Sequence, residues 1–327
     1  MLAFNHAVYG KCYVPYYNMY APLTSFKPEI YNALGERMDI FFLRDASGAH
    51  CPYGNNQKVK NRYFLWDRFN FALDTHFYTD ATVGEIMRGG GANQHNYALL
   101  QEPRSIISRS YDLLYENRIL ASEFEKILTH DEKLLDTLPN AMLYNACANM
   151  ICYSGDDPLR WSDEKYKEKC RLISMVVSGK EFTPLHLKRN ALAKQLVGRV
   201  DLFGNFVNNY IKYKSAALDT YCYHIALENE QNQYYFTEKI MDCFISMTIP
   251  LYLGAKAIGE FFNLDGIIIL TEEDISDLER FNRILTQCTP QNYIERLPAI
   301  IDNYHRSLRH LNSHNRLYEE LFLNKKD

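Results

Sequence analysis

Short apolar runs alternate with amphipathic stretches along most of this 327-residue chain. The runs have the length of strands, whereas segments such as 108–124 and 187–198 repeat their apolar positions with the period of a helix. The predicted strands cover 38–43, 97–100, 126–129, 171–177, 201–204, 223–228, 249–253 and 266–270. This alternation predicts an α/β protein whose sheets are mostly parallel.

The segment 153–169, YSGDDPLRWSDEKYKEK, interrupts this alternation with turn-forming residues and dense charge. The chain is also long enough for two domains of about 150 residues each. We therefore expect one domain over 1–155 and a second over 156–327. The tail from Arg306 onward is expected to form a surface helix with a frayed end.

Composition and charge exclude several classes of protein. The formal net charge of −4 lacks the large Lys and Arg excess that a nucleic-acid-binding surface needs. No apolar run reaches the roughly eighteen residues that cross a bilayer, the first residues do not resemble a leader, and no basic amphipathic tail supports peripheral membrane association. The eight cysteines form no C-x-x-C pair, so reduced thiols and a cytoplasmic location are expected.

The stretch 234–255, YYFTEKIMDCFISMTIPLYLGA, carries candidate chemistry at the start of a predicted helix. Thr237 stands at the N-cap position, which places Glu238 and Lys239 in the first turn. Because a helix N-terminus offers free N–H groups and partial positive charge, a lysine there favours phosphate binding. The strand before it ends at Glu228, at the edge where open α/β sheets bind ligands. The same pattern also fits a capped helix with a solvated Glu–Lys pair.

Three motifs in fixed order extend this pattern: LEN at 227–229, YFTEK at 235–239 and IPLYLG at 249–254. Together they resemble the donor-binding signature of the family 10 glycosyltransferases, the α-1,3/α-1,4-fucosyltransferases. The resemblance covers roughly 170–270 and includes an Arg-bearing helix followed by VDLFG. Two positions depart from the family pattern, because Cys222 replaces a lysine and Leu227 replaces a phenylalanine.

The resemblance implies a GT-B architecture, in which two Rossmann-like domains face each other across a cleft. It also implies inverting transfer of L-fucose from GDP-fucose to a hydroxyl of an acceptor glycan, with 1–155 as the acceptor domain and 156–327 as the donor domain. No metal cofactor is expected, and the chain has no D-x-D triplet. Arg189 and Lys239 would bind the diphosphate and Glu238 the ribose. The residues expected to bind the donor are Arg189, Glu228, Asn229, Tyr235, Glu238 and Lys239.

Inversion also requires a base, and the family's base is a glutamate at a strand end of the N-terminal domain. Glu102, in NYALLQEPRS, has a comparable position because it follows a predicted strand and precedes a proline. Glu85 and Asp131 are competing candidates. The nearby group LDTHFYTD, 73–80, contains two aspartates and a histidine, but its spacing matches no settled metal site.

Two alternatives to a fucosyltransferase remain open. A transferase of similar type could use another nucleotide sugar, because the residues expected to bind the phosphates and the ribose do not contact the sugar ring. A nucleotide-binding module without catalysis would need the same donor motifs but no base.

Overall fold

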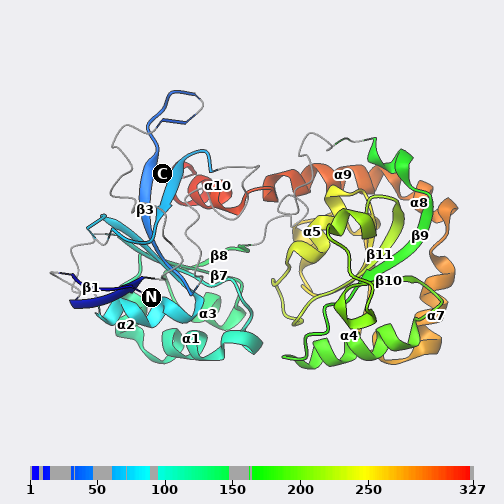
Figure 1. Ribbon diagram of the computed structural model, residues 1–327, viewed down its shortest axis with the longest axis horizontal. Coiled ribbons are helices and arrows are strands. Elements are labelled where there is room, and N and C mark those ends of the chain that lie inside the picture. Colours follow the sequence, from blue (N-terminus) through cyan, green and yellow to red (C-terminus); the bar gives the residue numbers. More distant parts are fainter. Residues whose placement is uncertain are drawn as a thin grey trace. The chain divides into compact units, whose positions relative to one another are not determined.

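A computed structural model of the chain describes residues 2–6, 10–14, 31–32, 34–46, 61–70, 72–88, 95–146, 162 and 164–324. The chain divides into two compact units (Figure 1). Unit 1 contains Met1–Ala146 together with His314–Asp327, and unit 2 contains Cys147–Ser313. The expected boundary between 155 and 156 lies outside the described residues.

Unit 1 is built on a parallel sheet of six strands in the order β4-β3-β5-β6-β7-β8. The strands are β3 (Asp39–Arg44), β4 (Phe64–Asp67), β5 (Thr75–Thr79), β6 (His95–Leu99), β7 (Lys126–Thr129) and β8 (Ala141–Leu143). An antiparallel pair, β1 (Leu2–His6) and β2 (Gly10–Val14), precedes them. The sequence-based prediction included β3, β6 and β7 but missed β1, β2, β4, β5 and β8.

Helices cover one face of this sheet, and the C-terminal segment covers the other. Alternate residues of β6 point to opposite faces, so that Ala98 packs with the helical cluster and Tyr97 with the C-terminal segment. The helical elements are η2 (Asp80–Arg88), α1 (Arg104–Glu116), α2 (Arg118–Ser122) and α3 (Glu132–Thr137). The predicted helix over 108–124 is interrupted at Asn117, which ends α1 and caps α2.

The C-terminal segment consists of α10 (Ser313–Tyr318) and the π-helical turn η10 (Glu319–Leu323). Leu317 and Leu321 join the cluster that β3 and β4 form on their face of the sheet. The Tyr318 hydroxyl also donates to Asp39 Oδ2 at 2.7 Å. These contacts explain why the tail belongs to unit 1, whereas the expected boundaries assigned it to the second domain.

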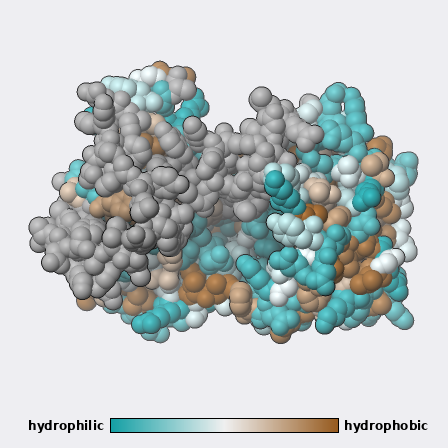
Figure 2. Space-filling view, viewed as in Figure 1, coloured by the Kyte–Doolittle hydropathy of each residue, from teal (hydrophilic) through white to brown (hydrophobic). Residues whose placement is uncertain are grey.

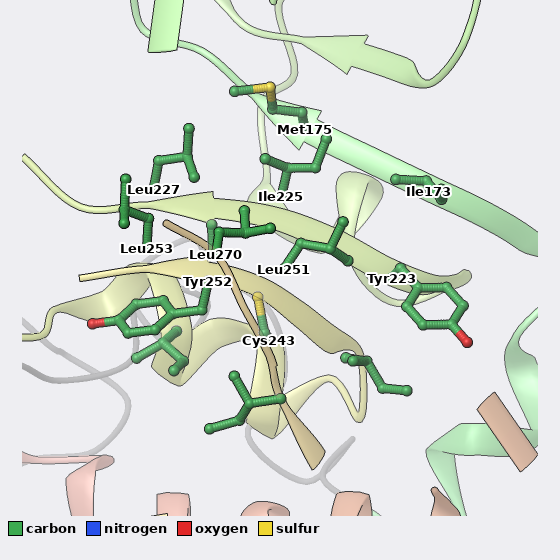
Figure 3. Close-up of a cluster of buried hydrophobic side chains, with 14 of the residues drawn as sticks. Ile173, Met175, Tyr223, Ile225, Leu227, Cys243, Leu251, Tyr252, Leu253 and Leu270 are labelled. Atoms are coloured by element: carbon green, nitrogen blue, oxygen red, sulfur yellow. The ribbon is translucent and has the colours of Figure 1, made fainter. Parts of the chain in front are cut away.

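Unit 2 contains a parallel sheet of five strands in the order β10-β9-β11-β12-β13. The strands are β9 (Arg171–Val176), β10 (Asp201–Phe203), β11 (Tyr221–Leu227), β12 (Ile249–Leu253) and β13 (Ile268–Ile269). The helices are α4 (Pro184–Gln195), α5 (Glu238–Ile245), α6 (Glu272–Ser276), α7 (Leu278–Gln287), α8 (Pro290–Glu295) and α9 (Leu297–Ser307). All residues of β11 and β12 are buried, as expected for central parallel strands covered on both faces (Figure 3).

The strand order predicts a ligand-binding crevice at the carboxyl ends of β9 and β11. From β9 the chain passes through α4 to β10 on one side, and from β11 it passes through α5 to β12 on the other. The connection therefore reverses direction between β9 and β11, and open α/β sheets bind ligands at such switch points. This crevice lies entirely within unit 2.

One face of unit 2 can be seen in a space-filling view. On its visible face, hydrophilic and hydrophobic residues are interspersed (Figure 2), which is ordinary for a folded domain. Within the described part of the chain, no helix has the length and apolar character needed to cross a bilayer.

Candidate functional site

The first turn of α5 lies at the carboxyl end of β11, next to the predicted crevice. Thr237 has an extended backbone, and its side-chain oxygen accepts a hydrogen bond from the Lys239 backbone N–H at 3.3 Å. Glu238 and Lys239 follow it in the first turn. The predicted N-cap is therefore confirmed.

Glu228 extends β11 by one residue and lies buried beneath this helix start. Its backbone N–H donates to Leu253 O at 2.8 Å, which continues the pairing with β12. Glu228 Oε1 accepts from Thr237 N at 2.8 Å, and Oε2 accepts from the Thr237 hydroxyl at 2.7 Å and from Lys239 Nζ at 3.0 Å. Both carboxylate oxygens therefore bind the protein itself, and Glu228 fixes the start of α5.

Gly254 makes this close packing possible. A Cβ atom on this residue would lie 2.5 Å from Glu228 Cγ and 2.2 Å from the Tyr252 hydroxyl oxygen. The same Tyr252 hydroxyl accepts from Ala255 N at 3.0 Å, which holds the ring under the turn. The glycine of IPLYLG is thus needed because a buried carboxylate and a tyrosine occupy the space of its side chain.

Arg189 supplies a second cation from α4, which follows β9. Its side chain is buried, and one guanidinium nitrogen donates to Ser178 Oγ at 3.3 Å. Arg189 Nε is buried and has no hydrogen-bond partner among the described residues. Burial lowers the pKa of Arg189, while the charge of Glu228 opposes this change. A buried donor without an acceptor is costly, and an anion bound in the crevice would satisfy it.

Asn229 connects the end of β11 to the start of α4. Its Oδ1 lies 2.8 Å from His186 Nε2, and its carbonyl accepts from the Thr183 hydroxyl at 2.7 Å. Since Thr183 N donates to His186 Nδ1, the hydrogen of the neutral ring is on Nε2, which donates to Asn229. Burial lowers the pKa of His186, as does the charge of Arg189. The sequence-based prediction did not include His186, although its place three residues after Thr183 is that of a capping box.

Glu238 is an ionised carboxylate in this environment. Burial opposes its ionisation, but the charges of Lys239 and Lys214 outweigh this effect and lower the pKa of Glu238 to about 2. Burial likewise opposes the charge of Lys239, and Glu228 and Glu238 raise the pKa of its ammonium group. Lys214 binds the fully buried Asp242 at 2.6 Å behind the first turn.

Tyr235 is buried, with 3% of its surface exposed. Its backbone N–H donates to Asn232 Oδ1 at 2.6 Å, and the backbone N–H of Tyr234 donates to the same oxygen at 3.0 Å. This turn leads the chain from the end of β11 to Thr237. All six residues expected to bind the donor therefore lie in unit 2: Arg189 is in α4, Glu228, Asn229 and Tyr235 lie between β11 and α5, and Glu238 and Lys239 form the first turn of α5.

The expected base lies in unit 1, at the carboxyl end of β6. The Glu102 side chain is exposed, and among the described residues it has no hydrogen-bonding partner. The two competitors are engaged, because Glu85 binds Arg44 and both oxygens of Asp131 accept from Arg104, at 2.9 and 3.0 Å. Of the three carboxylates, Glu102 is the one without a side-chain partner among the described residues.

The group at 73–80 has no metal-site geometry. Asp74 is exposed and His76 is fully buried against Phe42. No cluster of three metal-binding side chains occurs in the described part of the chain. Asp80 instead accepts hydrogen bonds from the backbone N–H groups of Gln101 and Glu102, a contact that the sequence pattern did not indicate.

Comparison with known proteins gives a family match for unit 2. Residues 166–287 match the model of the glycosyltransferase family 10 (fucosyltransferase) C-terminal domain. The α-(1,3)-fucosyltransferase FucT of Helicobacter pylori is 30% identical over 81 residues, which are 25% of this chain and 16% of that protein. The chain therefore matches only about a sixth of the length of this curated relative.

Two solved structures resemble most of the chain in fold. A crystal structure of an α1,3-fucosyltransferase has a TM-score of 0.51 at 16% identity and covers 88% of this chain and 90% of its own. HepE of Anabaena, solved with UDP-glucose, has a TM-score of 0.52 at 10% identity, with coverage of 87% and 99%. The expected α/β fold of GT-B type is confirmed by this likeness. The segment that carries LEN, YFTEK and IPLYLG thus lies within the residues, 166–287, that match the C-terminal domain model of glycosyltransferase family 10.

Proposed function

We propose that the protein is an inverting glycosyltransferase that transfers L-fucose from GDP-fucose to a hydroxyl of an acceptor glycan. The observation that carries this proposal is the buried Arg189, whose Nε lacks an acceptor among the described residues and whose charge interacts with Glu228, the ion-pair partner of Lys239. Two cations beside a helix N-terminus form a site suited to a diphosphate. The family of residues 166–287 supports fucose as the transferred sugar.

The contacts of Lys239 leave capacity for a ligand. Its ammonium group has three hydrogens, of which one is directed to Glu228 Oε2 and one to Thr237 Oγ1, at 3.0 and 3.1 Å. The third is available to a phosphate oxygen. Arg189 and Lys239 would then stabilise the negative charge that develops on the departing GDP, without a metal ion.

Glu238 suits the ribose of the donor. An ionised carboxylate only accepts hydrogen bonds, and its two oxygens can accept from two neighbouring hydroxyls. Because the pKa of Glu238 is about 2, this carboxylate is ionised at any working pH. Asn229 and Tyr235 would shape the nucleoside pocket from the β11–α5 connection, while Glu228 orients Lys239.

The reaction would be a single displacement. The acceptor oxygen forms a bond to the anomeric carbon as the bond from that carbon to the GDP oxygen breaks, and the electron pair leaves with the diphosphate. Glu102, with its free oxygens, takes the proton of the acceptor hydroxyl. Unit 1 would therefore supply the base and the acceptor site, and unit 2 the donor site.

A thermal-shift screen of nucleotide sugars tests the donor assignment. A ligand present at about 100 times its dissociation constant stabilises the fold by about 2.7 kcal/mol. GDP and GDP-fucose should raise the melting temperature, whereas UDP-glucose should leave it unchanged. A shift with UDP-glucose alone would contradict the proposal and favour a transferase that uses another nucleotide sugar, such as the UDP-glucose found with HepE.

Transfer itself is tested by incubating the full chain with radiolabelled GDP-fucose and a panel of galactose- and N-acetylglucosamine-containing acceptors. Product with the opposite anomeric configuration to the donor is expected. Binding of GDP-fucose without transfer or hydrolysis under any condition would favour the non-catalytic alternative.

A further inference from the structure

Asp80 occupies a constrained turn at the carboxyl end of β5. Its backbone has a φ of 44°, in the left-handed region that aspartate and asparagine tolerate better than most residues. The turn is held on both sides, because Thr79 N donates to Thr82 Oγ1 at 3.0 Å and the Thr82 hydroxyl contacts the Arg44 carbonyl at 2.7 Å. The position of the Asp80 carboxylate is therefore fixed by the surrounding backbone.

The Asp80 carboxylate binds the neighbouring strand end. Its Oδ1 accepts from the backbone N–H of Gln101 at 2.7 Å and from that of Glu102 at 3.2 Å. On the other side of the same residue, the Glu102 carbonyl accepts from the buried Tyr111 hydroxyl at 2.7 Å. The backbone of Glu102 is thus held at both its N–H and its carbonyl, while its side chain stays free.

Like charges face Asp80 from the neighbouring elements. Burial raises the pKa of Asp80 to about 6, the two backbone hydrogen bonds oppose this, and the charges of Glu102 and Asp45 add to it. Two ion pairs lie near Asp80. Asp45 binds Arg68 at 2.6 Å, and Arg44 binds Glu85, so these four charges are neutralised in pairs. Among the described residues, Asp80 itself has no such ion pair.

We propose that Asp80 is a positioning residue for transfer, whose ionised carboxylate holds the Glu102 backbone so that the Glu102 side chain can take the acceptor proton. This inference rests on the proposed function, in which Glu102 is the base. Hydrogen bonds to an ionised acceptor are roughly twice as strong as those to a neutral one, so protonation of Asp80 loosens the strand end. A base displaced by about 1 Å can lose about a hundred-fold in rate.

The contact is tested without catalysis by NMR of the full chain. The amide resonances of Gln101 and Glu102 should titrate with an inflection near pH 6, and Asp80→Asn, which tolerates the same backbone, should remove it. Glu102→Gln should move the inflection to lower pH, because the Glu102 charge contributes to the raised pKa. Amide titration that persists in Asp80→Asn would overturn the proposal.

Kinetics then test its effect on transfer. In the wild type, kcat should fall as the pH decreases through about 6. Asp80→Asn should lower kcat at pH 7.5 about ten- to a hundred-fold, leave the KM for GDP-fucose unchanged, and show no inflection near pH 6. A wild-type pH profile in this variant, or an inactive Asp80→Asn beside an active Glu102→Gln, would overturn the proposal.

Asp67→Asn is the matched control. Asp67 is a buried carboxylate at the end of β4, and its Oδ1 accepts from Phe69 N and Asn70 N at 2.7 and 2.9 Å. This variant should change the amide resonances of Phe69 and Asn70 but retain kcat and its pH dependence. If no transfer occurs with any donor, the proposed function fails, while the amide titration still decides whether Asp80 controls the Glu102 backbone.

Discussion

Lys239 Nζ donates to Glu228 Oε2 at 3.0 Å, which joins the first turn of α5 to the end of β11. Thr237 shares the same carboxylate through its backbone N–H and its hydroxyl. The three motif residues therefore form one unit in which a buried carboxylate orients a lysine. Removing any of them should affect both the local fold and ligand binding.

Arg189→Ala should weaken GDP binding about ten- to a hundred-fold, because hydrogen bonds between charged groups contribute about 1.5–3 kcal/mol. Lys239→Ala should bring binding below detection, since it also leaves Glu228 without its cation. Calorimetry with GDP measures both. The control is Lys188→Ala, because Lys188 is the neighbour of Arg189 in α4 and its side chain is an exposed partner of Glu272. Equal affinity in wild type and Arg189→Ala would remove the diphosphate assignment.

Glu228→Gln should destabilise unit 2 by about 1–3 kcal/mol, because a partly buried ammonium loses the charge that compensates it. Urea unfolding measures the loss. Glu272→Gln serves as the comparison, since its ion pair with Lys188 is exposed and such pairs contribute about 0–1 kcal/mol. If the two variants are equally stable, the buried pair does not hold the start of α5.

Gly254→Ala should lower both stability and GDP affinity, because its Cβ would meet Tyr252 and Glu228 at 2.2–2.5 Å. Gly198→Ala separates this effect from backbone strain. Gly198 has a φ of +76° but open space around its Cβ position. Gly198→Ala should therefore lower the free energy of unfolding only through backbone strain, by on the order of 1 kcal/mol. The Gly198 variant should bind GDP normally. Normal GDP affinity in Gly254→Ala would instead show that Glu228 can shift without disturbing Lys239.

Glu102→Gln should keep GDP-fucose binding and lose about 10²–10⁴-fold in transfer, the effect of removing a general base. Glu85→Gln and Asp131→Asn should transfer at closer to the wild-type rate, because these carboxylates are already bound to Arg44 and Arg104. Initial rates at saturating donor compare the three variants. A larger loss in either competitor would assign the base to that residue.

His224 should make the stability of unit 2 depend on pH. Burial, together with the charge of Lys214, lowers the pKa of His224 to about 3 in the folded protein. The unfolded chain therefore binds the additional proton, so the stability is complete above about pH 6.5 and decreases as the pH falls toward about 3. The slope from one such group is at most about 1.4 kcal/mol per pH unit.

His224→Asn isolates this contribution, because its amide can replace the contact of His224 Nδ1 with Ser174 Oγ, which is 2.7 Å long. The free energy of unfolding in urea, measured for both proteins between pH 5 and pH 8, should converge as the pH decreases from 6.5 to 5. Parallel curves would mean that His224 takes up its proton equally in both states.

The sequence by itself determined those features that depend on near neighbours. The apolar runs predicted β3, β6, β7 and all five strands of unit 2, because short continuous apolar runs are typical of strands in a parallel sheet that is covered on both faces. Thr237 marked the start of α5 because a capping side chain acts within two or three residues. The order of the three motifs was sufficient to indicate the resemblance to the family whose model matches residues 166–287.

Only the tertiary structure decided which groups these side chains meet. It directed both oxygens of Glu228 toward Thr237 and Lys239, and it placed Asp80 against a backbone 21 and 22 residues away. It also returned the C-terminal segment to unit 1. These contacts depend on which strands are adjacent and where each ends, and no local periodicity encodes that arrangement.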